Sequence, residues 1–201
     1  MKIIKLTLLM SITLFYNVAF GQEKKIEEKL PYYEIPVITQ KYTAGSVAAR
    51  LIDGLGFRFY WATEGLREED LNFKPSKDAK TTIEKVTHIY NMSEMIKNGA
   101  LKKITQSSQS PALSFNEMRQ KTLENLKIAS ENLINLNDDE LVNCALKIQQ
   151  GEKLTEYPFW NFINGPISDC IWHAGQIVSF RRQSGNPFSS KVNLLTGTVN
   201  K

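Results

Sequence analysis

Residues 164–187, NGPISDCIWHAGQIVSFRRQSGNP, carry the signals of a helix with both ends marked. Pro166 suits the first helical position, because proline lacks the N–H that has no helical partner there. Gly185 suits the position just after the helix, where the chain turns left-handed, and Pro187 prevents continuation. A pair of arginines falls in the last turn, at the negative end of the helix dipole. We therefore predict a helix that begins at Pro166 and ends before Gly185.

Three earlier segments, residues 43–66, 81–99 and 114–136, show apolar residues at the three- and four-residue spacing of an amphipathic helix. With the late helix they predict an all-α fold, a four-helix bundle over residues 42–187. Residues 141–157 interrupt the helical pattern, and either a short strand pair or an irregular excursion fits them. No alternation with a period of two is long enough to indicate a larger sheet.

Local signals mark the ends of these helices. Thr81 or Thr82 is the expected N-cap of the second helix, with Glu84 completing a capping box, and Ser114 is the expected N-cap of the third. Gly99 is the expected residue just past the end of the second helix.

The first helix has a predicted buried stripe and two interruptions. The stripe consists of Val47, Leu51, Leu55, Phe59, Ala62 and Leu66. Gly54 and Gly56 interrupt it, each at a cost of up to ~1 kcal/mol relative to alanine. Either the close approach of another helix or room for a ligand explains them, and packing is the simpler interpretation. The acidic residues 68–70 are interpreted as the start of a loop.

Residues 1–21 have the organisation of a secretory signal peptide: two lysines, an apolar run, and small residues at the cleavage position. We therefore predict cleavage after Gly21 and export, either periplasmic or secreted. The alternative is an N-terminal membrane anchor, but the apolar run is shorter than the ~20 residues of a span. No later segment is apolar enough to cross a membrane. Residues 22–41 are interpreted as a polar lead-in whose aromatic pair can pack back, and residues 188–201 as a C-terminal tail, either folded against the bundle or loose.

The mature chain of 180 residues suits one domain with a sizeable core. Loss of the signal lowers the net charge from +4 to +2, which is too small to indicate nucleic acid or anionic lipid as a partner. We expect a small-molecule substrate of unspecified identity, with a homodimer as an open alternative to a monomer. Cys144 and Cys170 permit one disulfide in an exported protein, or two buried free thiols.

Asp169 and His173 lie one turn apart on the late helix, and His88, the only other histidine, lies in the second. Two side chains at this spacing can bind one ion from one side, and a ligand from a facing helix leaves positions for water or substrate. Two imidazoles and a carboxylate suit Zn²⁺ or Ni²⁺, with Fe²⁺ as a further candidate, better than Mg²⁺ or Ca²⁺. Spacing alone leaves a structural alternative open, in which Asp169 interacts with the helix dipole and the histidines are hydrogen-bonded core residues.

The segments THIYNMSE and ISDCIWHAGQIVSFRRQSGNP resemble the DinB superfamily, and the resemblance covers residues 43–187. It implies a four-helix bundle with a divalent metal, usually held by one histidine of the second helix and an H-x-x-x-H of the last, commonly followed by Gly-Gln. His88 and His173 match, and Gly175-Gln176 follows, but Asp169 stands where the family has a histidine. A carboxylate can replace an imidazole as a ligand. Equally, the change can mark a protein that has lost its metal.

The resemblance also implies a function, a metal-dependent hydrolase or a thiol S-transferase. Export weighs against the transferase, because low-molecular-weight thiols are mainly cytoplasmic. The alternative is a non-catalytic exported bundle that binds a small ligand or a protein partner. No catalytic side chain is identifiable, and no organic cofactor is expected. Four residues are candidate neighbours of the ion: Glu64, Tyr90, Glu94 and Gln176. The three tryptophans are interpreted as core residues, with the lining of an apolar pocket as the alternative: Trp61, Trp160 and Trp172.

Overall fold

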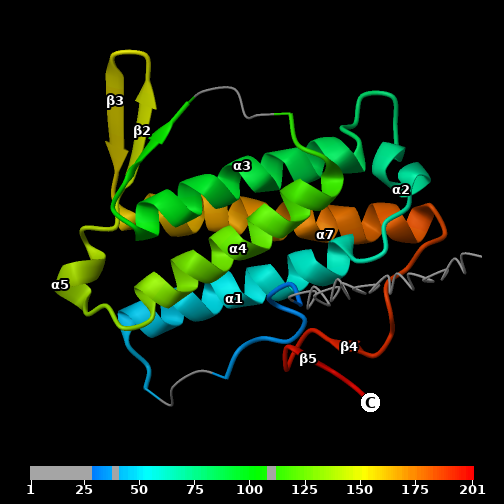
Figure 1. Cartoon of the computed structure of the whole chain (residues 1–201), viewed down its shortest axis with the longest axis horizontal. Helices are drawn as coiled ribbons and strands as arrows, with labels where there is room; N and C mark the ends of the chain where they lie inside the picture. The colour runs from blue at the N-terminus through cyan, green and yellow to red at the C-terminus, as the bar shows by residue number, and fades with distance from the viewer. Residues whose placement is uncertain (1–28, 38–40, 108–111) are drawn as a thin grey trace, which may run out of the picture.

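A computed structural model of the chain describes residues 29–37, 41–107 and 112–201. Its framework is a set of four long helices that run side by side (Figure 1). They are α1 Ala44–Thr63, α3 Thr82–Ala100, α4 Phe115–Leu133 and α7 Ser168–Gln183. Packing contacts join α1 to α4, α4 to α3, α3 to α7 and α7 back to α1, and these helices share one apolar core. The helix-rich part of the predicted fold is therefore confirmed.

The expectation of an all-α fold is incomplete, because a small three-stranded sheet lies at one end of the bundle (Figure 1). β1 Ile104–Gln106 pairs in parallel with β2 Leu146–Gln150, and β2 pairs antiparallel with β3 Lys153–Tyr157. Gly151 makes the hairpin turn between β2 and β3 at a positive φ of 60°. The strand pair was thus the correct alternative for residues 141–157. The parallel partner β1 has no local sequence signal, because it depends on a crossover through α4.

The C-terminal tail folds back onto the N-terminal segment. β4 Val192–Asn193 and β5 Thr198–Val199 form a two-stranded antiparallel sheet. The N–H of Ile35 donates to the carbonyl of Gly197 at 2.8 Å. Residues 188–201 are therefore folded against the rest of the chain, which was one of the two alternatives for this tail.

Short helices fill the connections between the long ones. They are α2 Glu68–Asn72, α5 Asp138–Leu141 and α6 Phe159–Phe162. The interpretation of residues 68–70 as a loop is wrong, since all three acidic residues lie in the first turn of α2, where the helix dipole favours negative charge. A helix of one turn shows no hydrophobic periodicity, and for this reason the sequence pattern did not reveal it.

The predicted start of the last helix at Pro166 is wrong. The chain is already helical from α6 onward, and Pro166 lies inside a π-helical turn, η1 Ile163–Ile167, which leads directly into α7. Gly165, at φ −86° and ψ −106°, marks a kink in this turn. A proline inside a helix lacks one hydrogen bond and its ring clashes with the carbonyl four residues earlier, so a wider, kinked turn accommodates it.

The predicted end of this helix is confirmed. Gly185 has a φ of +79°, in the left-handed region where a side chain would be strained. The N–H of Asn186 donates to the carbonyl of Arg181 at 2.8 Å, and the N–H of Gly185 donates to the carbonyl of Arg182 at 3.2 Å. This pair of hydrogen bonds is a Schellman motif.

In α3, the predicted start is correct and the predicted end is wrong. Thr81 is the N-cap, and its side chain and that of Glu84 form the expected capping box. Gly99 lies inside the helix and not after it; the left-handed residue is Lys102, with a φ of +58°. The reason is tertiary, because the ring of Phe162 packs directly on Gly99.

We predict that Gly99→Ala destabilises the protein although alanine is the better helix former. An added Cβ would meet the Phe162 ring at 2.4 Å, so the buried ring must move. Overpacking of this kind costs about 1 to 3 kcal/mol. Gly175→Ala in α7 is the matched control: its Cβ meets nothing within 4 Å, so we expect stabilisation by up to about 1 kcal/mol from helix propensity. Urea denaturation of both variants measures the difference, and equal effects would contradict the packing explanation.

The buried stripe of α1 is only partly as predicted. Leu55, Phe59 and Ala62 are fully buried, but Val47 is 57% exposed. Gly56 faces the ring of Tyr32, which a Cβ would approach to 2.5 Å. Close packing therefore explains this glycine, although the partner is the N-terminal segment and not a helix.

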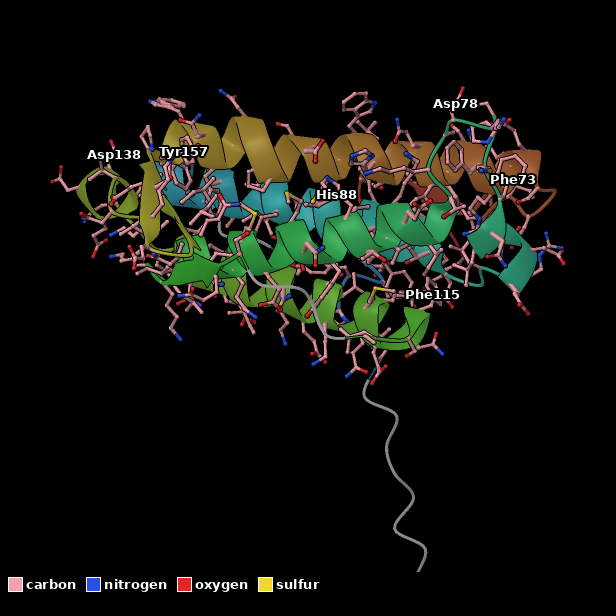
Figure 2. All side chains as sticks on the ribbon, turned by 90° about the horizontal axis from the view of Figure 1, so that it is seen from above. Phe73, Asp78, His88, Phe115, Asp138 and Tyr157 are labelled. Carbon is pink, nitrogen blue, oxygen red and sulfur yellow. The ribbon has the colours of Figure 1, made fainter. Side chains whose placement is uncertain are left out.

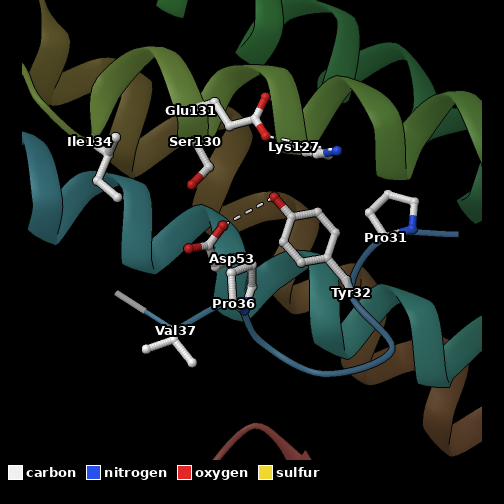
Figure 3. A pocket seen from close by; sticks show the side chains of 9 residues that line it. All are labelled: Pro31, Tyr32, Pro36, Val37, Asp53, Lys127, Ser130, Glu131 and Ile134. Atoms are coloured by element: carbon white, nitrogen blue, oxygen red, sulfur yellow. Dashed lines mark hydrogen bonds and ion pairs between the residues drawn. The ribbon is translucent and has the colours of Figure 1, made fainter. Parts of the chain in front are cut away.

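Tyr32 fixes the N-terminal segment to the bundle through a buried polar contact (Figure 3). Its hydroxyl donates to Oδ1 of Asp53 on α1 at 3.1 Å, and both residues are buried. Burial raises the pKa of both the Asp53 carboxyl and the Tyr32 hydroxyl. The two groups border a cavity of about 320 Å³ between α1, α4 and this segment.

Cys144 and Cys170 are free and buried in the structure. The Cys144 Sγ lies 4.0 Å from the carbonyl oxygen of Ala100, and the Cys170 Sγ lies 4.0 Å from that of Ile89. Those carbonyls are about 16 Å apart along α3, since a helix rises 1.5 Å per residue. The structure therefore agrees with two buried free thiols and not with a disulfide between Cys144 and Cys170.

None of the helices in the described parts of the chain is long and apolar enough to span a bilayer. The predicted signal peptide, residues 1–21, lies outside the described residues, as do residues 22–28 and 38–40 of the predicted lead-in.

Candidate metal centre

The structure brings the three predicted ligand residues together where α3 runs beside α7. Figure 2 labels His88 on α3, next to α7. Asp169 is in the first turn of α7, and His173 follows one turn later on the same face. The π-helical turn η1 leads directly into this first turn.

Asp169 lies between the two imidazoles and contacts both. The His88 Nε2 is 2.7 Å from Asp169 Oδ2, and the His173 Nε2 is 3.4 Å from Asp169 Oδ1. The two imidazole rings are nearly perpendicular, with centroids 4.9 Å apart. One ligand atom from each residue can be chosen so that all three atoms lie within 4.8 Å of one another.

Gln176 fixes the orientation of His173. Its Oε1 lies 2.7 Å from the Nδ1 of His173 and accepts the proton of that nitrogen. The other nitrogen, Nε2, faces Asp169 and lies 3.4 Å from its Oδ1. A hydrogen bond of this kind is the usual support for a metal-ligating histidine.

The cluster is open to solvent on one side. The side chains of His88, Asp169 and His173 are 34%, 32% and 18% exposed. Partial exposure leaves room for water or substrate beside an ion. Two imidazole nitrogens and a carboxylate are a donor set that Zn²⁺, Ni²⁺ and Fe²⁺ accept. The residues present therefore fit a divalent transition metal.

Of the other predicted neighbours, only Gln176 contacts the cluster by a hydrogen bond. Tyr90 is two residues from His88, about 200° around α3, and it is buried on another side of the helix. Glu64 pairs with Arg119, and Glu94 pairs with Lys97. Helical periodicity alone places residues 88 and 90 on different sides of α3, so the sequence already argued against Tyr90 as a neighbour of the ion.

The tryptophan predictions were correct only for Trp61, which is buried. Trp160 and Trp172 are 71% and 67% exposed. The indole of Trp172 stacks on the imidazole of His173, with centroids 5.7 Å apart and planes 8° from parallel. Sequence adjacency alone does not predict this contact, because neighbouring residues of a helix generally point apart.

Cys170 follows Asp169 directly but points into the core, where it is fully buried. Burial raises the pKa of its thiol. It is therefore a packing residue of α7 and not a fourth ligand.

The fold and this cluster define a helix-rich bundle with a His/Asp/His group between two helices. Among solved structures, the chain is similar to the crystal structure of YjoA, a DinB-like protein from Bacillus subtilis. The two share 14% sequence identity at a TM-score of 0.47, over 68% of this chain and 93% of that one. No protein-family model matches the sequence. No curated protein matches it either.

Proposed function

We propose that this protein binds one divalent transition-metal ion through His88, Asp169 and His173, and that it acts as a metal-dependent hydrolase or thiol S-transferase. Zn²⁺ and Ni²⁺ are the first candidates, and Fe²⁺ is the next. The observation that carries the proposal is the convergence of three ligand atoms from α3 and α7 within 4.8 Å of one another.

The residues of the chain have separate roles in this proposal. His173, oriented by Gln176, presents its Nε2 toward the centre of the cluster. Asp169 contributes the negative charge that two neutral imidazoles lack, and its two oxygens face the two rings. When bound, the metal would lower the pKa of a coordinated water toward ~7 or hold a substrate thiol as thiolate.

Export remains part of the proposal through residues 1–21. If the protein is exported, low-molecular-weight thiols are scarce around it, which favours the hydrolase over the transferase. The substrate would reach the cluster from the side on which its three side chains are partly exposed.

A second candidate function, a non-catalytic metal-binding bundle, is supported by the surroundings of the cluster. Among the described residues, Gln176 forms a hydrogen bond to the cluster, and its amide does not transfer protons. Glu64 and Glu94, the two carboxylate candidates from the sequence, pair with cations instead. An enzyme at this site would have to rely on the metal alone for catalysis, and this favours the non-catalytic candidate.

The first test is metal binding by protein purified without a nickel column. We expect uptake of about one equivalent of Ni²⁺ or Zn²⁺, as a three-ligand site predicts. Bound Ni²⁺ should quench the fluorescence of Trp172, because its indole stacks on His173, and Trp172→Phe should lose this part of the quenching. Trp160→Phe is the matched control at an exposed tryptophan. Uptake below about a tenth of an equivalent contradicts both candidate functions, since each requires a three-ligand ion.

The two candidates are separated by turnover of the metal-loaded protein. Hydrolysis of p-nitrophenyl esters, or transfer of a thiol to monochlorobimane, should require the metal and disappear in His173→Ala. Full metal binding with neither reaction would favour the non-catalytic bundle.

A further inference from the structure

A second cavity lies on the opposite side of α7 from the metal centre. It has a volume of about 330 Å³ and lies between α1, α7 and the C-terminal tail. Gly175 lines it, and Gly175 is two residues from His173, about 200° around the helix axis. The cavity is therefore separate from the His/Asp/His cluster.

The walls of this cavity are mainly apolar. Trp61 of α1, Val178 of α7 and Phe188 of the tail contribute to the lining. The N–H of Trp61 already donates to the carbonyl of Tyr33 at 3.1 Å, so its ring presents an apolar face. An apolar lining and a volume near 300 Å³ are typical of a site for a small organic molecule.

The charge of the cavity comes from two arginines. Arg58 of α1 and Arg182 of α7 line it, and no acidic residue does. Arg58 donates one hydrogen bond to the carbonyl of Gly54 at 2.9 Å, and Arg182 lies over the Phe188 ring at 5.8 Å. Neither guanidinium forms an ion pair with a carboxylate of the described residues, whose arginine pairs involve Arg67 and Arg119. Each guanidinium has five N–H donors, so several remain for a ligand.

Gly175 is an exposed residue of α7 at this cavity. A Cβ built on it meets no atom within 4 Å, so the groove above this turn of α7 is open. A glycine in a helix interior costs about 1 kcal/mol relative to alanine, and close packing of a neighbour does not explain it here.

We propose that this cavity binds an organic anion with an apolar body, such as a medium-chain or aromatic carboxylate. The apolar part would lie over Gly175 against Trp61 and Val178. The carboxylate would accept hydrogen bonds from Arg58 and Arg182, because planar guanidinium groups match carboxylate geometry. The site is independent of the metal and of the proposed reaction.

The test is calorimetric titration of the mature protein, residues 22–201, with octanoate. Octanol and octylammonium are the control probes of the same chain length. All titrations are done with chelator present, so that the carboxylate cannot bind a metal. We expect octanoate to bind more tightly than either uncharged octanol or cationic octylammonium. Arg182→Ala should weaken octanoate binding by about tenfold or more, as loss of a charged hydrogen-bond donor predicts.

Two further variants make the result specific. Gly175→Phe should abolish binding by filling the groove, while its melting temperature shows that it is folded. Lys127→Ala, which removes a cation at the other cavity, should leave the octanoate affinity unchanged, and so should His173→Ala. Absence of octanoate binding, equal binding of octylammonium, or insensitivity to Arg182→Ala and Gly175→Phe would each overturn the proposal. A change in oligomeric state of Gly175→Phe without octanoate binding would assign the groove to a second copy of the chain and would also overturn it.

Discussion

His173→Ala should reduce metal binding at least about 100-fold, from stoichiometric uptake to a level near background. The expected size follows from the apparent binding free energy of structural Zn²⁺ in zinc-finger peptides, about 10 to 16 kcal/mol from four ligands, of which each ligand supplies a substantial part. Equilibrium dialysis with Zn²⁺ or Ni²⁺, followed by elemental analysis, measures the loss. His88→Ala should behave in the same way, although His88 comes from α3 and not from α7.

Thermal unfolding separates a ligand from a core histidine. A metal that binds only the folded state stabilises it by about 4 kcal/mol at a thousandfold excess over Kd. In the wild type this stabilisation should appear on adding metal, and in His173→Ala it should be absent, while the two apo proteins melt at similar temperatures. Equal destabilisation of the apo and holo forms would instead show that His173 is a core residue without a metal.

Asp169 provides the sharpest control, because the family resembled has histidine at this position. Asp169→Ala should lose the metal, whereas Asp169→His should retain it with three imidazole ligands. Gln176→Leu removes only the hydrogen bond to His173 Nδ1, so its effect should be intermediate, about 10- to 100-fold. Retention of full affinity by Asp169→Ala would exclude Asp169 as a ligand.

Asp70→Ala should lower the free energy of unfolding by about 3 kcal/mol, the second large effect we expect. The Asp70 side chain is fully buried and pairs with the Arg67 guanidinium. Its Oδ2 also accepts from the N–H of Arg67 at 2.8 Å and from Asn186 Nδ2 at 2.6 Å, and its Oδ1 accepts from Ser184 Oγ at 2.5 Å. Asp70 thus joins α2 to the C-terminal end of α7, and its removal leaves these donors without their acceptor.

Glu69→Ala is the matched control for Asp70→Ala. Glu69 is the neighbouring carboxylate on α2 and also pairs with Arg67, but its side chain is 65% exposed. Exposed ion pairs contribute about 0 to 1 kcal/mol, so this variant should unfold almost like the wild type. Similar losses in the two variants would contradict a special role for the buried carboxylate.

The pH dependence of stability gives an independent check on Asp70. The hydrogen bonds from Arg67 hold the pKa of the Asp70 carboxyl well below its ordinary value of about 3.9. The unfolded chain therefore binds a proton at higher pH than the folded protein does. The contribution of Asp70 is fully present above about pH 5 and is lost as the pH falls through the folded-state pKa. The difference in unfolding free energy between wild type and Asp70→Ala should accordingly shrink below pH 4.

The starts of α3 and α4 were predictable because they depend on neighbouring residues. The capping box at Thr81 and the N-cap at Ser114 form as expected, since each N-cap side chain bonds only three residues along the chain. The left-handed Gly185 is local in the same sense. Gly99 and Pro166 carry equally strong local signals, but packing by Phe162 and a π-helical turn override them.

The chain by itself determined which side chains were available for a site: its two histidines, and a carboxylate one turn from His173. Helical periodicity placed Asp169 and His173 on one face, because the spacing of a helix is fixed by its backbone. Only the tertiary structure decided that α3 lies against α7, so that the His88 Nε2 lies 2.7 Å from Asp169 Oδ2. The same packing left a cavity with two arginines behind α7, and no local pattern contains such information, because it arises from surfaces far apart in the sequence.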